Sequence, residues 1–131
     1  MPLTGVRIFA EKWFASDEQF NQLYPLSIQA LARRHWTPLS VARKAAGFLA
    51  AENNVRILDI GSGVGKFCLA AAYYKPKAFY YGIEQRKSLV SHAEKAREIQ
   101  MCIRDRPFAR AAVKIFSFCS CVNDSKGFCG K

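Results

Sequence analysis

Apolar residues recur at helical spacing through the first fifty residues, and they divide this part of the chain into short predicted helices. Residues 16–19 (Ser-Asp-Glu-Gln) are typical of a helix start, because the serine can cap the helix and the glutamine can close a capping box. Pro25 ends or kinks this helix, and a second short helix is predicted over residues 26–32.

A longer helix is predicted after Thr37 and Pro38, which are typical of a helix N-cap followed by proline at the first helical position. Its small and apolar residues are spaced to face a core, and its charged residues point outward. Polar residues end it near 52–54. Residues 1–54 are therefore predicted to form a helical lead-in to the domain that follows.

Short apolar runs then alternate with helical patterns. The predicted order is a strand at 55–60, a helix at 66–74, a strand at 78–83, and a polar helix from 86 or 87 to about 100. The first strand is largely apolar, which predicts burial on both faces of a parallel sheet. This order is the βαβ unit of a doubly wound sheet. We therefore expect residues 55–100 to be part of an α/β, Rossmann-like domain that is incomplete.

Composition and charge indicate which kinds of partner the chain can bind. The 131 residues carry a net charge of +10, which raises the question of nucleic acid. Residues 1–100 hold 14 basic and 8 acidic side chains, and the last 31 residues hold 6 basic and 2 acidic ones. Charges spaced in this way are typical of solvated helix faces, so a nucleic-acid partner is possible but not indicated. Without an apolar run of roughly 18 residues or a secretory signal, we expect a cytoplasmic protein with no membrane partner.

A glycine-rich turn directly follows the first predicted strand. Gly61, Gly63 and Gly65 permit a tight turn, close approach of a ligand to the backbone, and close packing of helix on strand. The next helix points unpaired N–H groups into the same crevice, which favours an anionic ligand group. The dinucleotide fingerprint fails because Lys66 stands where its last glycine belongs, and the P-loop pattern fails because Phe67 follows that lysine.

Glu84 follows the second predicted strand, 23 residues after Gly61. This distance suits an acid that reaches the ribose hydroxyls of an adenosine bound across the strand ends. A carboxylate that accepts from two hydroxyls forms charge-assisted bonds, each worth about 1.5–3 kcal/mol. The alternative is that Glu84 only caps the helix that follows it.

Residues 57–85 resemble motifs I and II of class I S-adenosylmethionine-dependent methyltransferases, and the resemblance covers about the first hundred residues. It implies that Asp59 lies near the methionine amino end of S-adenosyl-L-methionine. Gly61 and Gly63 would line the methionine and ribose portions, and Glu84 would hold the ribose. The cofactor-binding residues expected on this basis are Asp59, Gly61, Ser62, Gly63, Gly65, Glu84 and Thr37.

The segment before the first strand is open to two interpretations. By the same resemblance, the Thr37 hydroxyl would bind the methionine carboxylate and Trp36 would cover it. The alternative is an ordinary helix cap beside a core tryptophan. His35 and His92 have no partner that suggests a metal site or a catalytic triad.

Residues 101–131 differ from the rest of the chain. They hold four of the five cysteines and show neither the third nor the fourth strand of a class I domain. The first six, Met-Cys-Ile-Arg-Asp-Arg, resemble a peptide that recurs when sequencing-adapter DNA is translated. We hypothesise that the native sequence stops near Gln100, followed by a non-native or disordered tail. The second strand would then keep an open edge, and the chain would bind cofactor weakly or not at all.

The alternative for the tail is a zinc site. Cys102, Cys119, Cys121 and Cys129 supply four thiolates, which is the usual number for structural zinc. They form one Cys-x-Cys flanked by two single cysteines rather than two matched Cys-x-x-Cys pairs. We therefore expect no metal site.

The complete protein is predicted to transfer the methyl group of S-adenosylmethionine to a nucleophile by in-line displacement. None of the residues present is a convincing general base, so no catalytic residue is assigned. The methyl acceptor is unknown, with a protein lysine or another nitrogen nucleophile among the candidates. Two other functions stay open: a nucleotide-dependent oxidoreductase with the same fold, and a basic, non-enzymatic nucleic-acid-binding module.

Overall fold

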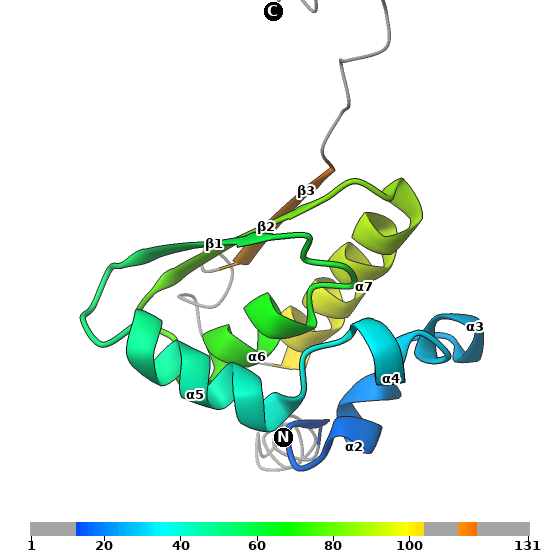
Figure 1. Ribbon diagram of the computed structural model, residues 1–131, viewed down its shortest axis with the longest axis horizontal. Coiled ribbons are helices and arrows are strands. Elements are labelled where there is room, and N and C mark those ends of the chain that lie inside the picture. The colour runs from blue at the N-terminus through cyan, green and yellow to red at the C-terminus, as the bar shows by residue number, and fades with distance from the viewer. Residues whose placement is uncertain (1–12, 104–112, 118–131) are drawn as a thin grey trace, which may run out of the picture.

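The computed structural model describes residues 13–103 and 113–117, which form an α/β structure as predicted. Within these residues, three parallel strands make one sheet in the order β1-β2-β3, and helices cover one of its faces (Figure 1). No helix in this part of the chain is long and apolar enough to cross a membrane. The elements are α2 Asp17–Asn21, α3 Leu26–Gln29, α4 Ala32–His35, α5 Leu39–Leu49, β1 Arg56–Ile60, α6 Lys66–Tyr74, β2 Phe79–Glu84, α7 Lys87–Ile103 and β3 Val113–Ser117.

The register of the sheet brings the predicted site residues together at the edge formed by the carboxyl ends of the strands. Asp59 of β1 lies beside Gly82 of β2, which in turn lies beside Ile115 of β3. All three strands run in the same direction, so their carboxyl ends meet at the same edge of the sheet. Ligands of open parallel sheets bind outside this edge. The glycine turn after β1 and Glu84 at the end of β2 therefore meet there.

A third strand follows Gln100, contrary to the prediction that the chain has none there. All five residues of β3 pair with β2, so β2 does not have the open edge that was predicted. Val113 and Ile115 are buried while Lys114 between them is exposed, the alternation of a strand with one covered face. This alternation covers only five residues in a segment without other strand signals, which is too short a pattern to predict a strand.

The predicted boundary near Gln100 also lies inside an element, because α7 continues to Ile103. Residues 104–112 and 118–131 lie outside the described residues, and so do Cys119, Cys121 and Cys129 of the alternative zinc site. The origin of residues 101–131 therefore stays a prediction.

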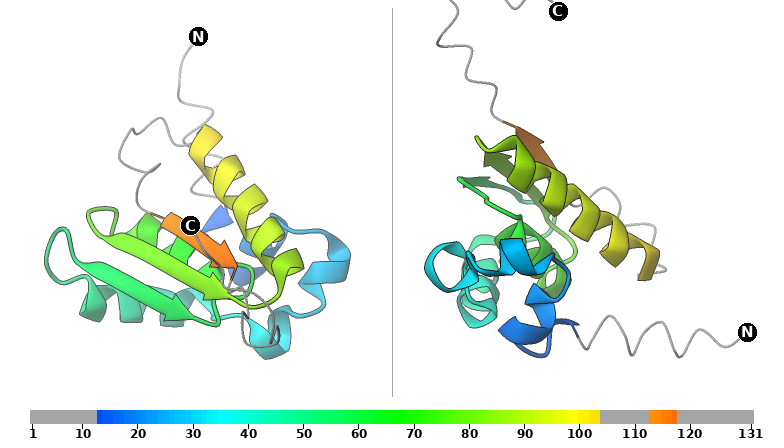
Figure 2. Two further views of the ribbon diagram at one scale, coloured as in Figure 1. Left: turned by 90° about the horizontal axis from the view of Figure 1, so that it is seen from above. Right: turned by 90° about the vertical axis from the view of Figure 1, so that its right-hand side faces the viewer.

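The β1 strand is covered on one face, not on both as predicted. Ile57 is buried, whereas Leu58 is 55% and Ile60 is 80% exposed. The two crossovers, β1-α6-β2 and β2-α7-β3, step across the sheet in the same direction, and right-handed crossovers then place both helices on the same face. In the left view of Figure 2 the strands lie in front of the helices that cover their other side.

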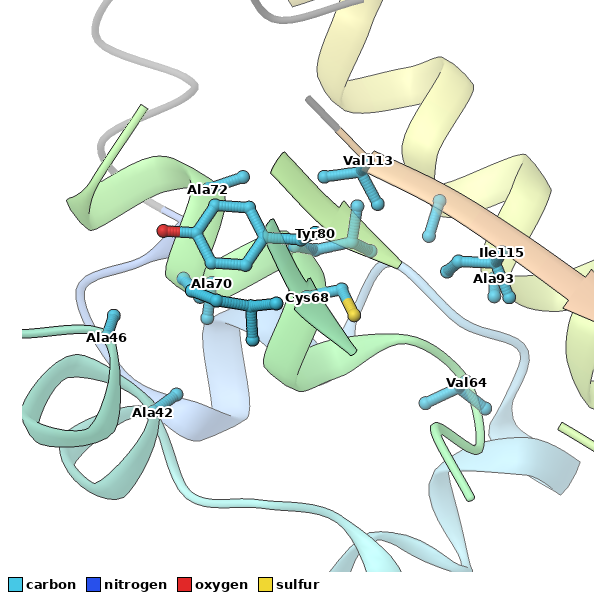
Figure 3. Packing of buried hydrophobic residues seen from close by; sticks show 14 of the residues in the cluster. Ala42, Ala46, Val64, Cys68, Ala70, Ala72, Tyr80, Ala93, Val113 and Ile115 are labelled. Atoms are coloured by element: carbon cyan, nitrogen blue, oxygen red, sulfur yellow. The ribbon is translucent and has the colours of Figure 1, made fainter. Parts of the chain in front are cut away.

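The core fills the layer between the sheet and its helices. Tyr80 of β2 and Cys68 of α6 are fully buried at its centre (Figure 3). Small side chains such as Ala42 and Ala70 line the contact between α5 and α6, which allows the two helices to pack closely. The buried residues form a single cluster that extends from the N-terminal helices to β3.

The start of the first described helix agrees with its prediction in part. The Ser16 hydroxyl caps α2 by accepting a hydrogen bond from the Gln19 N–H at 3.1 Å. The side-chain oxygen of Gln19 is buried and has no partner among the described residues, so the reciprocal bond of a capping box is not formed. After Pro25, two one-turn helices, α3 and α4, replace the single helix that was predicted.

Thr37 is not the cap of α5, contrary to the prediction. The helix begins at Leu39, with Pro38 in the N-cap position and no capping bond from its side chain. The cap comes instead from Asp17 of α2, whose Oδ1 accepts from the Leu39 N–H at 2.9 Å. A carboxylate 22 residues away satisfies this helix end, and no local motif could have identified it.

Candidate functional site

The glycine loop between β1 and α6 depends on three left-handed residues. Gly61, Gly63 and Gly65 have φ angles of 77°, 57° and 78°, a region in which other residues are strained. A Cβ atom at Gly61 or Gly63 would meet no atom within 4 Å, so the space beside these two residues is open. A Cβ at Gly65 would instead overlap Ile115 Cδ1. Gly61 and Gly63 thus leave room for a ligand, while Gly65 allows the loop to pack on β3.

Backbone hydrogen bonds attach this loop to the end of β2. The N–H groups of Gly61 and Ser62 both donate to the Ile83 carbonyl, at 2.8 and 3.0 Å. Gly65 N–H donates to the Ser62 carbonyl at 2.9 Å and closes the turn. The loop is therefore held in one conformation within the described structure, with its open side toward the edge where ligands of such sheets bind.

Glu84 joins the glycine loop to the start of α7. Its Oε2 accepts from the Gly63 N–H at 2.9 Å, and its Oε1 accepts from the backbone N–H of Arg86 at 2.9 Å and from Nε of Arg86 at 3.0 Å. The residue is only 4% exposed. Burial raises the pKa of this carboxyl, but the bonds from Arg86 and Gly63 outweigh burial and hold the pKa below its usual value.

These contacts bear on both interpretations of Glu84. The bond to the Arg86 N–H supports the start of α7, as the capping alternative expected. A carboxylate offers about four lone-pair sites, and three of them already accept from N–H donors, which leaves one free. Two ribose hydroxyls would therefore need a position now taken by the Arg86 guanidinium, which belongs to a side chain that is 56% exposed. The ribose role of Glu84 stays a prediction.

Asp59 is the second acid at this edge, and its surroundings differ. It lies on the helix-covered face of β1, like Ile57, and is half-buried. Its carboxylate makes no hydrogen bond or ion pair with any part of the chain that the structure describes. Burial raises the pKa of this carboxyl, and its charge adds to burial in raising the pKa of the neighbouring Cys68 thiol. A half-buried carboxylate without a partner suits a ligand that brings its own donor.

Ser62 and Thr37 have side chains without a hydrogen-bond partner in the described part of the chain, and their contact with the cofactor stays a prediction. The Ser62 hydroxyl is turned toward β2, where it packs against Gly82, and it has no hydrogen-bond partner among the described residues. The Thr37 side chain makes no hydrogen bond in this part of the structure. Beside it, Trp36 packs edge-on against the buried ring of Tyr24 at 4.8 Å between ring centroids. Trp36 is thus half-buried at the margin of the core, and the predicted roles of Thr37 and Trp36 at the cofactor stay predictions.

His35 is exposed and His92 is half-buried, and neither joins a cluster. Within residues 13–103 and 113–117, no group of three or more His, Cys, Asp and Glu side chains is placed to hold a metal ion.

Lys66 is a residue of this site whose role does not follow from the sequence alone. In the sequence, Lys66 only shows that the dinucleotide fingerprint fails. In the structure, its side chain is 4% exposed and pairs with Asp17, which lies 49 residues earlier in the chain. The single local signal was a lysine at the first position of an otherwise apolar helix, which is too common to indicate burial.

Residues 51–106 match the family model of a methyltransferase domain. This stretch of the chain is therefore similar in sequence to methyltransferase domains. The match begins just after α5 and includes β1, the glycine loop, β2 and α7. It ends six residues after Gln100, and β3 lies beyond it. Among curated protein sequences, no match to the chain is found.

Solved methyltransferases share the fold of this domain. Precorrin-6y C5,15-methyltransferase from Geobacter metallireducens GS-15 is 16% identical to this chain, with a TM-score of 0.53. The aligned region covers 66% of this chain and 42% of the Geobacter protein. A SAM-dependent methyltransferase from Thiobacillus denitrificans, in complex with S-adenosyl-L-homocysteine, is 20% identical with a TM-score of 0.51, covering 72% and 37%. The chain therefore spans about two fifths of the length of these structures. The incomplete Rossmann-like architecture predicted from the sequence is confirmed.

Proposed function

We propose that this chain is the cofactor-binding part of an S-adenosyl-L-methionine-dependent methyltransferase. The observation that carries the proposal is the open space beside Gly61 and Gly63, in a loop that Glu84 holds through the Gly63 N–H and that follows Asp59 at the end of β1. The family match and the shared fold support it. The methyltransferase from Thiobacillus denitrificans is a complex with S-adenosyl-L-homocysteine, which is the cofactor after methyl transfer.

The residues present fit this cofactor. The unpartnered carboxylate of Asp59 would accept from the amino group of the methionine portion. The backbone at Gly61 and Gly63 allows the ligand to approach closely, and Glu84 would accept from the ribose once Arg86 makes room. When bound, the cofactor supplies a methyl group activated by its sulfonium, so the protein mainly aligns the acceptor. No described residue is assigned a catalytic role.

Methyl transfer itself is a proposal for the whole protein, because the chain spans 42% and 37% of the two solved structures. Its methyl acceptor remains a nucleophile of unknown identity, with nitrogen nucleophiles such as a protein lysine as candidates.

The test is direct binding of S-adenosyl-L-homocysteine to the 131-residue chain, measured by ligand-observed NMR because weak binding is expected. Asp59→Asn should weaken binding by about tenfold, since one charge-assisted bond is lost. Burial already disfavours the Asp59 charge, so asparagine should leave the melting temperature unchanged or higher. A measured melting temperature no lower than that of the unaltered chain shows that loss of binding in this variant does not come from unfolding.

Glu52→Gln is the matched control, because Glu52 is exposed outside the site. Binding of NAD without binding of S-adenosyl-L-homocysteine would favour the oxidoreductase alternative. Salt-sensitive binding of DNA or RNA that survives Asp59→Asn, without binding of S-adenosyl-L-homocysteine, would favour the nucleic-acid alternative.

A further inference from the structure

Lys66 is a buried cation directly after the glycine loop. It is the first residue of α6, and its side chain is 4% exposed. Its Nζ lies 2.6 Å from Oδ1 of Asp17 and 3.3 Å from Oδ1 of Asn21, both on α2. A lysine is rarely buried unless its charge is paired, and here both acceptors come from the N-terminal lead-in.

Two aromatic rings of the lead-in complete the surroundings of this ammonium group. Nζ lies 5.4 Å from the ring centroid of Phe20 and 6.0 Å from that of Trp36. Rings at this distance attract a cation through their electron-rich faces. The charge of Lys66 is therefore directed into the lead-in, away from the open space beside Gly61 and Gly63.

The Asp17 carboxylate connects this cation to another helix. The same Oδ1 atom that pairs with Lys66 also accepts from the N–H of Leu39, which begins α5. Burial raises the pKa of Asp17, but the bonds from Lys66 and Leu39 outweigh it, so the carboxyl stays ionised. One oxygen atom thus joins α2, the start of α5 and the start of α6.

A second bond ties the lead-in to the glycine loop itself. The hydroxyl of Tyr24, which is 3% exposed, donates to the Val64 carbonyl at 2.8 Å. Val64 and Lys66 flank Gly65, so both attachments act on the last turn of the loop. The edge of the loop near α6 is fixed by the lead-in, while Gly61 and Ser62 are fixed by β2.

We propose that Lys66 is a positioning residue for the cofactor site. Through Asp17 it locks the glycine loop against the N-terminal lead-in, so that the loop holds its ligand-binding shape before the ligand arrives. The proposal rests on the proposed function for the identity of the ligand. The ammonium group is 4% exposed and is held by two acceptors and two rings of the lead-in, so Lys66 acts through the loop backbone and does not contact the ligand. A loop that is ordered in advance binds more tightly because less freedom is lost on binding.

The test compares Lys66→Met with Lys87→Met in the full 131-residue chain. Lys87 is the matched control, because it is also the first residue of a helix, α7, and is exposed. In the ligand-free chain, Lys66→Met should speed amide hydrogen exchange at loop residues 61–66 by about tenfold, the loss of one charged hydrogen bond. It should also weaken S-adenosyl-L-homocysteine binding by about tenfold. Lys87→Met should change neither.

Asp17→Asn keeps the shape of the partner and provides a second route if Lys66→Met does not fold. Since both variants remove the same ion pair, the double variant should lose no more binding than either single one. Additive losses would overturn the proposal. Faster exchange throughout the sheet and α7 with unchanged ligand affinity would also overturn it, because that pattern indicates a role in stability alone.

The two proposals can fail separately. If the unaltered chain does not bind S-adenosyl-L-homocysteine, the proposed function fails, and exchange at residues 61–66 still decides whether Lys66 positions the loop. If the chain binds and Lys66→Met leaves both loop exchange and affinity unchanged, only the role of Lys66 is rejected.

Discussion

At the scale of single residues, two carboxylates at the same edge of the sheet have opposite environments. Glu84 accepts three hydrogen bonds, from Gly63 and Arg86, and these hold its pKa down despite burial. Asp59 accepts none from the described part of the chain, and burial raises its pKa. Glu84 therefore already serves the architecture of the loop, whereas Asp59 lacks a partner that a ligand can supply.

The low pKa of Glu84 predicts a pH dependence of stability. Its carboxyl titrates below the ordinary value of 4.5 in the folded chain, so the charge stabilises the fold above about pH 4.5. This contribution is lost as the pH falls through the folded pKa. Urea unfolding of the unaltered chain should therefore show a falling free energy of unfolding below that pH. Glu84→Gln, which cannot ionise, should be less stable at neutral pH and show a smaller decline in acid.

Other carboxyls contribute to the acid sensitivity of both proteins, so the difference between the two curves is the quantity to measure. Glu98→Gln, at an exposed position of α7, is the control and should follow the unaltered chain. Parallel curves for Glu84→Gln and the unaltered chain would contradict the prediction.

At the scale of elements, the fit between β2 and the glycine loop sets the position of that loop. Gly82 faces the loop, and a Cβ atom there would lie 2.7 Å from Oγ and 2.8 Å from Cβ of Ser62. It would also lie 3.4 Å from Cγ1 of Ile115, which packs under Gly65 from β3. Strand β3 and a glycine in β2 thus support the loop from below, and neither belongs to the glycine motif itself.

Gly82→Ala should therefore destabilise the chain by about 1–3 kcal/mol, because the added methyl group forces the loop backbone to move. Thermal or urea unfolding measures this directly. Gly47→Ala is the contrasting substitution, since Gly47 is exposed inside α5 with no atom within 4 Å of the new Cβ. It should stabilise the chain by about 0.5–1 kcal/mol through helix propensity alone.

The contact with Ser62 can be isolated by a second substitution. Ser62→Gly removes both atoms that the new methyl group would strike, so the double variant with Gly82→Ala should recover part of the lost stability. Equal stability of Gly82→Ala and the unaltered chain would show that the loop adjusts freely and is not positioned by β2.

At the scale of the whole molecule, one face of the sheet is covered by helices and the other presents apolar side chains. Leu58 and Ile60 of β1 and Phe116 of β3 are each at least half exposed on that second face. β1 is also an edge strand within the described sheet. An exposed apolar face beside an open strand edge promotes association between chains.

Ile60→Thr should therefore reduce self-association of the 131-residue chain, measured by analytical ultracentrifugation over a range of protein concentrations. Threonine keeps the β-branched shape that suits a strand, so the melting temperature should change little at a residue that is 80% exposed. The same change at Ile57, which is 8% exposed, should instead unfold the chain. Unchanged association of Ile60→Thr would exclude this face as its cause.

Local sequence determined the elements whose causes are local. The Ser16 cap, the break at Pro25, the glycine turn and the two strands around α6 were all predicted, because each depends on residues within a few positions of one another. The resemblance of residues 57–85 to a methyltransferase agrees with the family model that matches residues 51–106.

Only the tertiary structure decided what depends on residues far apart in sequence. It supplied the third strand, the single covered face of β1, the cap of α5 by Asp17, and the burial of Lys66. Each depends on contacts between segments far apart in the sequence, which the spacing of hydrophobic residues does not indicate. A five-residue strand is also too short to show a clear pattern by itself. The glycine loop was therefore visible in the sequence, whereas the neighbours that hold it in place were visible only in the fold.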